Sequence, residues 1–147
     1  MLLETKYLGK MDIEENKIIL FEAGIPGFLE EKEFVLLDIP GQEIMQMLQS
    51  LRTPDIAFFI TNPHNFYADY TFTLDESIVE ALHIENKEEI AILSIMTVRE
   101  PLQASTINLK APIIINNRTK LGKQLILNGD QYDMKATITL SEQEGSD

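Results

Sequence analysis

Two histidines and many carboxylates are the side chains in this sequence that could carry acid–base chemistry. A hydrolase needs a base beside a nucleophile, or two carboxylates facing each other in a cleft. The acidic residues instead cluster near expected turns, as is typical of a solvated surface: Glu14 and Glu15, then Glu30, Glu31 and Glu33, then Glu85, Glu88 and Glu89. His64 lies in a turn, and His83 lies where an expected helix ends and a cation can meet its last carbonyl groups. The sequence therefore predicts no catalytic residue and a protein that is not an enzyme.

Metal ions and cofactors are not expected either. The chain has no cysteine, which removes thiol catalysis, disulfides and thiolate metal sites, and zinc would need three or four nitrogen or sulfur ligands at close spacing. Residues 24–28, Gly-Ile-Pro-Gly-Phe, have the glycines of a phosphate loop but not the Lys-Ser/Thr that follows them, and Glu30 and Glu31 would repel a phosphate. A Pro-Gly turn of type II, with Gly27 at positive φ, is the better interpretation.

Residues 62–70 form the strongest candidate for binding another protein. Three aromatic residues, Phe66, Tyr67 and Tyr70, lie there beside Asp69 and between two turns. Rigid aromatic side chains that are partly exposed make good anchors for a partner. The competing interpretation is a loop that closes one end of the fold. Phe28 has two readings as well: it packs on the core, which we favour, or it stands exposed as a contact.

The charge of the chain limits its partners. It has 24 acidic and 12 basic side chains and a net charge of −12. Nucleic acids and anionic membranes attract Lys and Arg, so direct binding to either is not expected. Residues 1–6 lack the features of a signal peptide, and the apolar runs are far shorter than the ~20 residues that span a bilayer. We therefore expect a cytoplasmic protein.

Short apolar runs rich in β-branched and aromatic residues predict most of the fold. Runs at 18–21, 34–37, 56–61, 90–98, 113–115 and 125–127, and alternating patterns at 70–74, 107–111 and 132–140, predict eight or nine strands. Apolar residues at helical spacing predict two short helices, one over 44–51 and one that Asp75 caps and that carries Ile78, Val79 and Leu82. We expect a mainly β chain, an antiparallel barrel-like fold with two short helices, forming one domain over residues 1–147 with a frayed tail at 141–147.

The order of several short strings resembles the flagellar assembly factor FliW family. The strings are Phe21 with residues 24–28, then 50–58, Asn62-Pro63, Asp69-Tyr70, Glu100-Pro101, 106–113 and 124–127. Each string is weak alone, but together they extend over nearly the whole chain. The resemblance supports the single-domain expectation.

The resemblance implies a regulator without enzymatic activity or cofactor. FliW-like proteins bind flagellin in the cytoplasm and, when flagellin is exported, bind the translational repressor CsrA, which restores flagellin synthesis. An RNA-binding repressor is basic, and an acidic protein complements it. The expected protein-binding residues are Phe28, Asn62, Phe66, Tyr67, Asp69, Tyr70, Asn108 and Lys110.

Two alternatives stay open from the sequence. One is a general secretion chaperone for a flagellar protein, with no role linked to RNA. The other is a small carbohydrate-active β-barrel that uses Asp55 and Asp69 in a cleft. A cleft with converging polar groups would favour the enzyme, and a broad apolar patch with an acidic rim would favour the partner-binding protein.

Overall fold

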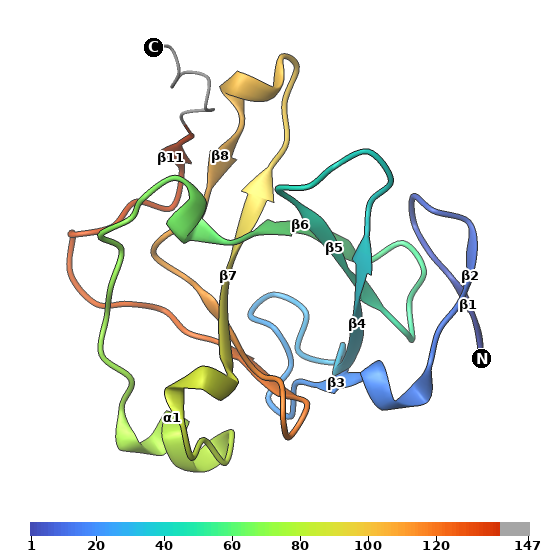
Figure 1. Cartoon of the computed structure of the whole chain (residues 1–147), viewed down its shortest axis with the longest axis horizontal. Helices are drawn as coiled ribbons and strands as arrows, with labels where there is room; N and C mark the ends of the chain where they lie inside the picture. Colours follow the sequence, from blue (N-terminus) through green and yellow to red (C-terminus); the bar gives the residue numbers. More distant parts are fainter. Residues whose placement is uncertain (139–147) are drawn as a thin grey trace.

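A computed structural model describes residues 1–138 of the chain (Figure 1). Its strands are β1 (Leu2–Glu4), β2 (Lys10–Asp12), β3 (Ile19–Leu20), β4 (Glu33–Asp38), β5 (Gln46–Ser50), β6 (Ala57–Thr61), β7 (Ile90–Thr97), β8 (Thr106–Ile107), β9 (Ile113–Asn116), β10 (Leu121–Gln124) and β11 (Ala136–Thr137). Its helices are α1 (Glu76–Ala81) and four short 3₁₀ turns, η1 (Glu15–Lys17), η2 (Pro63–Asn65), η3 (Lys87–Glu89) and η4 (Leu102–Ala104). The tail expected at 141–147 lies outside the described residues.

Seven strands close into a barrel, as the sequence predicts. They pair in the order β7-β6-β5-β4-β3-β10-β9, and β9 returns to β7, which completes the ring (Figure 1). The prediction of antiparallel pairing is wrong at one place. The short strand β3 runs parallel to β10, and the two meet at a single residue pair, Leu20 and Leu121.

The inside of the barrel is filled by aliphatic and aromatic side chains from all around the ring. The buried members are Ile19, Phe21, Ile25, Phe34, Leu48, Ile60, Leu93, Ile113 and Ile115. Phe21 and Phe34 meet edge to face with their ring centres 5.3 Å apart, a favourable geometry for two aromatic rings. Removal of these side chains from water is the main force that holds the ring closed.

The helix predicted over 44–51 is wrong, because this segment contains the central strand β5. Leu48 points into the barrel core, and Met47 points outward into a second buried cluster with Val35 and Leu37. A strand that is buried on both faces has apolar residues at consecutive positions and loses its alternation. In residues 44–51 the apolar positions also match the spacing of an amphipathic helix, which is why the sequence predicted a helix there.

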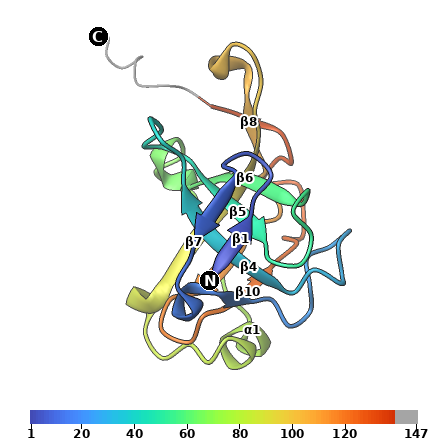
Figure 2. The same ribbon diagram turned by 90° about the vertical axis from the view of Figure 1, so that its right-hand side faces the viewer.

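The outer face of β5 is buried because the N-terminal residues cover it. The hairpin of β1 and β2 forms a separate two-stranded sheet that crosses the outside of β4 and β5 (Figure 2). Leu3 and Ile13 from this region pack onto Met47. The buried side chain of Gln49 adds a polar link, since its Oε1 accepts the N–H of Lys6 at 2.9 Å.

Several of the predicted strands are shorter or displaced in the structure. Of the stretch predicted at 107–111, strand β8 includes Ile107 alone. Residues 125–127 follow β10 as an extended segment, and residues 70–74 are extended without strand pairing. Of the alternating stretch predicted at 132–140, the described part, residues 132–138, forms a strand at the two residues of β11, and residues 139–140 lie outside the described residues. Within residues 1–138, no helix is long and apolar enough to cross a bilayer.

The predicted helix after Asp75 is confirmed as α1. Asp75 occupies the position before the helix, although its side chain makes no capping hydrogen bond. Ile78 and Leu82 bury the apolar stripe against Ile114 of β9. His83 ends the helix at a φ of 53°, a left-handed conformation that few residues other than glycine adopt.

The predicted turn at residues 25–28 is confirmed. The N–H of Phe28 donates to the carbonyl oxygen of Ile25 at 2.6 Å, and Gly27 has a φ of +86°. Phe28 does not pack into the core; it remains 41% exposed, with its ring edge-on to Phe58 at 5.5 Å. The structure therefore places Phe28 at the surface, and its role as a contact stays a prediction.

Gly27→Val is expected to lower the free energy of unfolding by about 1–2 kcal/mol, because a β-branched residue is disfavoured at positive φ. Nothing lies within 4 Å of an added Cβ there, so the expected loss comes from the backbone conformation and not from a clash of the Cβ. Thermal melting followed by circular dichroism is the measurement. A melting temperature equal to that of the parent would contradict the strain argument.

Candidate functional site

The aromatic loop, residues 62–70, begins with a tight turn that Asn62 stabilises. The side-chain oxygen of Asn62 accepts the N–H of His64 at 2.9 Å, and Pro63 starts the 3₁₀ turn η2. Phe66 and Tyr67 follow as half-buried rings that pack against the cluster around Leu109. They therefore have one apolar face in the fold and another part accessible to solvent.

Tyr70 is not available as an anchor, so the prediction of an exposed contact is wrong for this residue. Its ring is 4% exposed and meets the edge of Tyr132 at 4.7 Å. Its hydroxyl donates to the carbonyl oxygen of Leu109 at 2.6 Å. Burial, with a smaller contribution from Tyr132, raises the pKa of the Tyr70 hydroxyl well above its ordinary value. A buried tyrosine that finds a hydrogen-bond partner belongs to the core.

His64 links the two ends of the aromatic loop. Its Nε2 lies 2.9 Å from the carbonyl oxygen of Tyr70, and its Nδ1 lies 3.2 Å from the side-chain oxygen of Asn62. Both ring nitrogens therefore lie within hydrogen-bonding distance of an oxygen of the loop. The ring thus holds the loop in shape.

Asn108 and Lys110 shape the turn beside the aromatic loop. The side-chain oxygen of Asn108 accepts the N–H groups of Lys110 and Ala111, each at 3.0 Å. The Nζ of Lys110 donates to the carbonyl oxygen of Gly129 at 2.6 Å. These two predicted contact residues therefore brace the neighbouring backbone, while Leu109 between them receives Tyr70.

The remaining predicted residues lie on the surface. Asp69 is exposed within the aromatic loop, and Phe28 lies on another loop against Phe58. Asp55 is exposed as well. Two exposed carboxylates do not resemble an acid–base pair held in a cleft. Among residues 1–138, no group of three or more His, Cys, Asp or Glu side chains could hold a metal ion.

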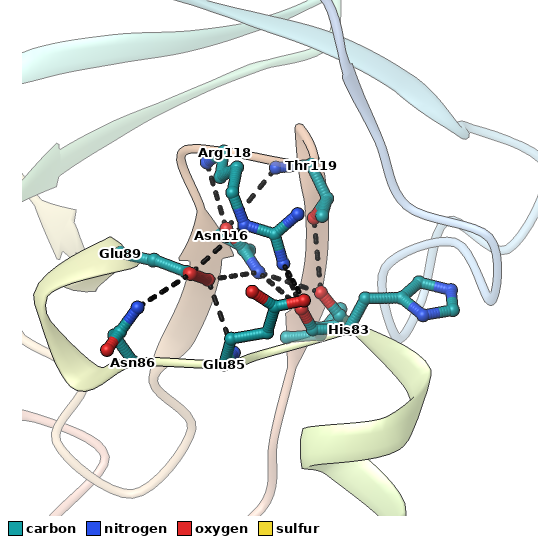
Figure 3. A network of polar contacts seen from close by, with 8 residues as sticks. His83, Glu85, Asn86, Glu89, Asn116, Arg118 and Thr119 are labelled. Atoms are coloured by element: carbon teal, nitrogen blue, oxygen red, sulfur yellow. Dashed lines mark hydrogen bonds and ion pairs between the residues drawn. The ribbon is translucent and has the colours of Figure 1, made fainter.

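A polar network at the end of α1 was not predicted from the sequence (Figure 3). Asn116 is fully buried, and its Nδ2 donates to the carbonyl oxygen of Leu82 at 2.8 Å. Its Oδ1 accepts the N–H of Arg118 at 2.9 Å, and the Oγ1 of Thr119 donates to Leu82 at 3.1 Å. The turn between β9 and β10 thus supplies partners for carbonyl groups that the helix leaves unpaired.

Charged side chains close the outer side of this network. The Arg118 guanidinium contacts Glu89 at 3.0 Å and Glu85 at 3.5 Å, and it donates to the carbonyl oxygen of His83 at 2.7 Å. Desolvation opposes the charge of Glu89, but hydrogen bonds from Arg118, from the Glu85 N–H and from Asn86 hold the pKa of Glu89 below its ordinary value. The hydrogen bond to Glu89 in turn raises the pKa of Arg118. The network holds structure together and has no free nucleophile.

Comparison with known proteins decides the family. The family model described as "FliW protein" matches residues 2–138. The chain belongs to the FliW family. A FliW protein is a flagellar assembly factor, and the described fold agrees with that of a solved relative, "Crystal structure of the flagellar assembly factor FliW", at a TM-score of 0.88. That relative is 41% identical, and the match covers 93% of this chain and 96% of that one.

Two sequence relatives support the same assignment. The flagellar assembly factor FliW of Oceanobacillus iheyensis is 50% identical over 138 residues, which is 94% of each chain. The flagellar assembly factor FliW of Bacillus subtilis is 44% identical over 138 residues, which is 94% of this chain and 96% of that one. The resemblance to FliW in the sequence is thereby confirmed.

Proposed function

We propose that this FliW chain binds flagellin in the cytoplasm and, when flagellin is exported, binds and antagonises the translational repressor CsrA. Its role would then be to regulate flagellin translation through protein contacts, without catalysis or a cofactor. The observation that carries the proposal is the match to the FliW family over residues 2–138, together with the shared barrel. Relatives that cover nearly the same length carry the name of flagellar assembly factor.

The charge of the chain supports a basic partner. A net charge of −12 favours the approach of a protein with a positive surface and speeds their encounter. A repressor that binds RNA needs such a surface. The same negative charge disfavours binding of RNA to this chain. The chain can therefore approach the repressor without binding the RNA itself.

The aromatic loop supports a contact surface. Phe66 and Tyr67 lie half-buried on the barrel end, beside the exposed Asp69 and Asn62. Rings held in this way lose little conformational freedom when a partner covers them. We propose Phe66 and Tyr67 as anchors, with Asp69 and Asn62 at their rim.

The proposal is tested by calorimetric titration of flagellin and of CsrA into the purified chain, beside an assay of CsrA bound to flagellin messenger RNA. We expect binding of both proteins and release of the RNA from CsrA when the chain is added. A chain that binds flagellin but not CsrA would be a secretion chaperone. A chain that binds neither would contradict the proposed function.

Phe66→Ala and Tyr67→Ala are each expected to weaken partner binding by roughly 1–3 kcal/mol, as is typical of aromatic anchors. The measurement is titration of flagellin, with circular dichroism to verify the fold. Tyr7→Ala is a matched control, because Tyr7 is an exposed ring on the N-terminal hairpin, outside the aromatic loop, and stacks on Phe59 at 5.1 Å. If both loop variants bind like the control, the anchors lie elsewhere.

A further inference from the structure

A groove of about 640 Å³ runs between two extended segments of the chain, residues 71–75 and residues 123–128. Both segments lie beside the barrel above α1, one green and one orange in Figure 1. Phe72, Ile78 and Leu125 line the groove and pack with the apolar cluster around Ile114. The groove therefore has an apolar floor between two lengths of extended backbone.

One wall of the groove is a strand edge with unused hydrogen-bonding groups. The N–H groups of Leu125 and Leu127 donate to the carbonyl oxygens of Pro112 and Lys110 at 2.9 and 2.8 Å. Backbone groups alternate in direction along an extended chain, so Ile126 between them turns its N–H and C=O to the other side. Within residues 1–138, these two groups make no hydrogen bond. The side chain of Ile126 is 63% exposed as well.

The opposite wall has the same character. Thr71 exchanges two hydrogen bonds with the hydroxyl of Tyr132, at 3.1 and 2.9 Å. Beyond it, the backbone groups of Phe72 and Thr73 make no hydrogen bond within the described part of the chain. An extended peptide laid in the groove would thus find unpaired donors and acceptors on both sides. This is the arrangement that strand addition requires.

The charges around the groove indicate the sign of its occupant. Residues 68–80 and 123–135, which hold both walls and their flanks, carry six acidic and two basic side chains. The groove lining itself holds one acid and one base, Asp75 and Lys123, so the excess of negative charge lies on the flanks. A peptide with Lys or Arg between apolar residues complements this rim.

We propose that the groove binds an extended segment of a protein partner, basic with alternating apolar residues, which adds to the sheet along residues 124–128. The groove offers a strand of about five residues, judged by the length of its walls at ~3.3 Å per residue. The identity of the protein partner rests on the proposed function. The addition of a peptide strand to residues 124–128 does not depend on that function. The groove lining does not include Phe66 or Tyr67, although Phe72 and Tyr132 of the groove pack on the same apolar cluster as these two rings.

The test starts from a phage library of random heptapeptides selected on the intact chain. The best peptide is synthesised with blocked ends, and its dissociation constant is measured by fluorescence anisotropy. We expect enrichment of Lys or Arg alternating with Val, Ile or Thr. Ile126→Pro is expected to weaken this peptide roughly tenfold, because proline lacks the N–H that pairs with the peptide. That N–H has no partner in residues 1–138, so we expect the melting temperature to stay near that of the parent.

Two controls separate pairing from side-chain loss. Ile126→Ala removes the same side chain, which is 63% exposed, but keeps the backbone N–H, and it is expected to keep most of the affinity that Ile126→Pro loses. Peptides methylated on alternate backbone nitrogens leave the protein untouched; one set of positions should abolish the binding and the other should spare it. No enrichment, or equal affinity for Ile126→Pro together with indifference to methylation, would overturn the proposal. Flagellin affinity of the parent chain tests the proposed function separately.

Discussion

Gly24→Ala is expected to lower the free energy of unfolding by about 3 kcal/mol or more, since it combines backbone strain with a clash that cannot relax. Gly24 has a φ of +71°, and an added Cβ would clash with the carbonyl oxygen of Leu29 and lie 2.7 Å from its Cα. The atom it meets belongs to the backbone of the same loop. Relief would therefore require the whole turn around Ile25 to move, although Ile25 is buried in the barrel core.

Urea denaturation followed by circular dichroism measures this loss, and Gly41→Ala is the matched control. Gly41 has a φ of +81° but nothing within 4 Å of an added Cβ. The control should lose only the strain of the left-handed conformation, about 1 kcal/mol. Equal losses in the two variants would show that the close approach to Leu29 contributes nothing.

Asn116→Asp is expected to destabilise the fold by about 3 kcal/mol at neutral pH, because it places a buried charge against acceptors. The amide nitrogen of Asn116 faces the carbonyl oxygens of Leu82 and His83 at 2.8 and 3.3 Å and the Glu89 carboxylate at 3.3 Å. An aspartate there would bring a negative oxygen to three other oxygens, while its second oxygen still accepts from Arg118.

The loss should shrink as the pH falls, which distinguishes charge repulsion from a change of packing. The repulsion raises the pKa of the new carboxyl in the folded state above that of the unfolded chain. Protonation of this carboxyl then favours the folded state. The difference in the free energy of unfolding between the variant and the parent therefore becomes smaller from pH 7 towards pH 4. Asn117→Asp adds the same charge at an exposed neighbour and should cost less than about 0.5 kcal/mol. A difference that stays constant with pH would contradict the electrostatic explanation.

The sequence was sufficient to predict elements with a clear local signal. Strand β4 is an apolar run between two acidic residues, helix α1 carries apolar residues at helical spacing, and the Pro-Gly turn carries its own backbone preference. Strand β5 was missed because the N-terminal hairpin buries its outer face, and this contact joins residues more than thirty positions apart, Leu3 and Met47. The sequence pattern within residues 44–51 cannot show that the distant hairpin buries this face.

The candidate site was predictable only as a segment. Aromatic residues between two turns marked the loop at 62–70, but burial of Tyr70 depends on the carbonyl oxygen of Leu109, 39 residues away. The network around Asn116 joins it to Leu82 across 34 positions. No spacing rule relates such partners. The groove beside Ile126 could not be predicted either. The sequence indicates only a strand at 125–127, whereas the groove exists because residues 71–75 lie opposite this segment.

The single contact between β3 and β10 sets when the barrel can form during synthesis. The ring is complete only after Leu121 meets Leu20, a hundred residues earlier in the chain. Until the ribosome has delivered β9 and β10, the nascent chain holds β4, β5 and β6 as a sheet with free edges at β3 and β7. Closing so long a loop makes folding slow. Between the synthesis of β7 and that of β10, a sheet of β3 to β7 therefore has two unpaired edges that can pair with another chain.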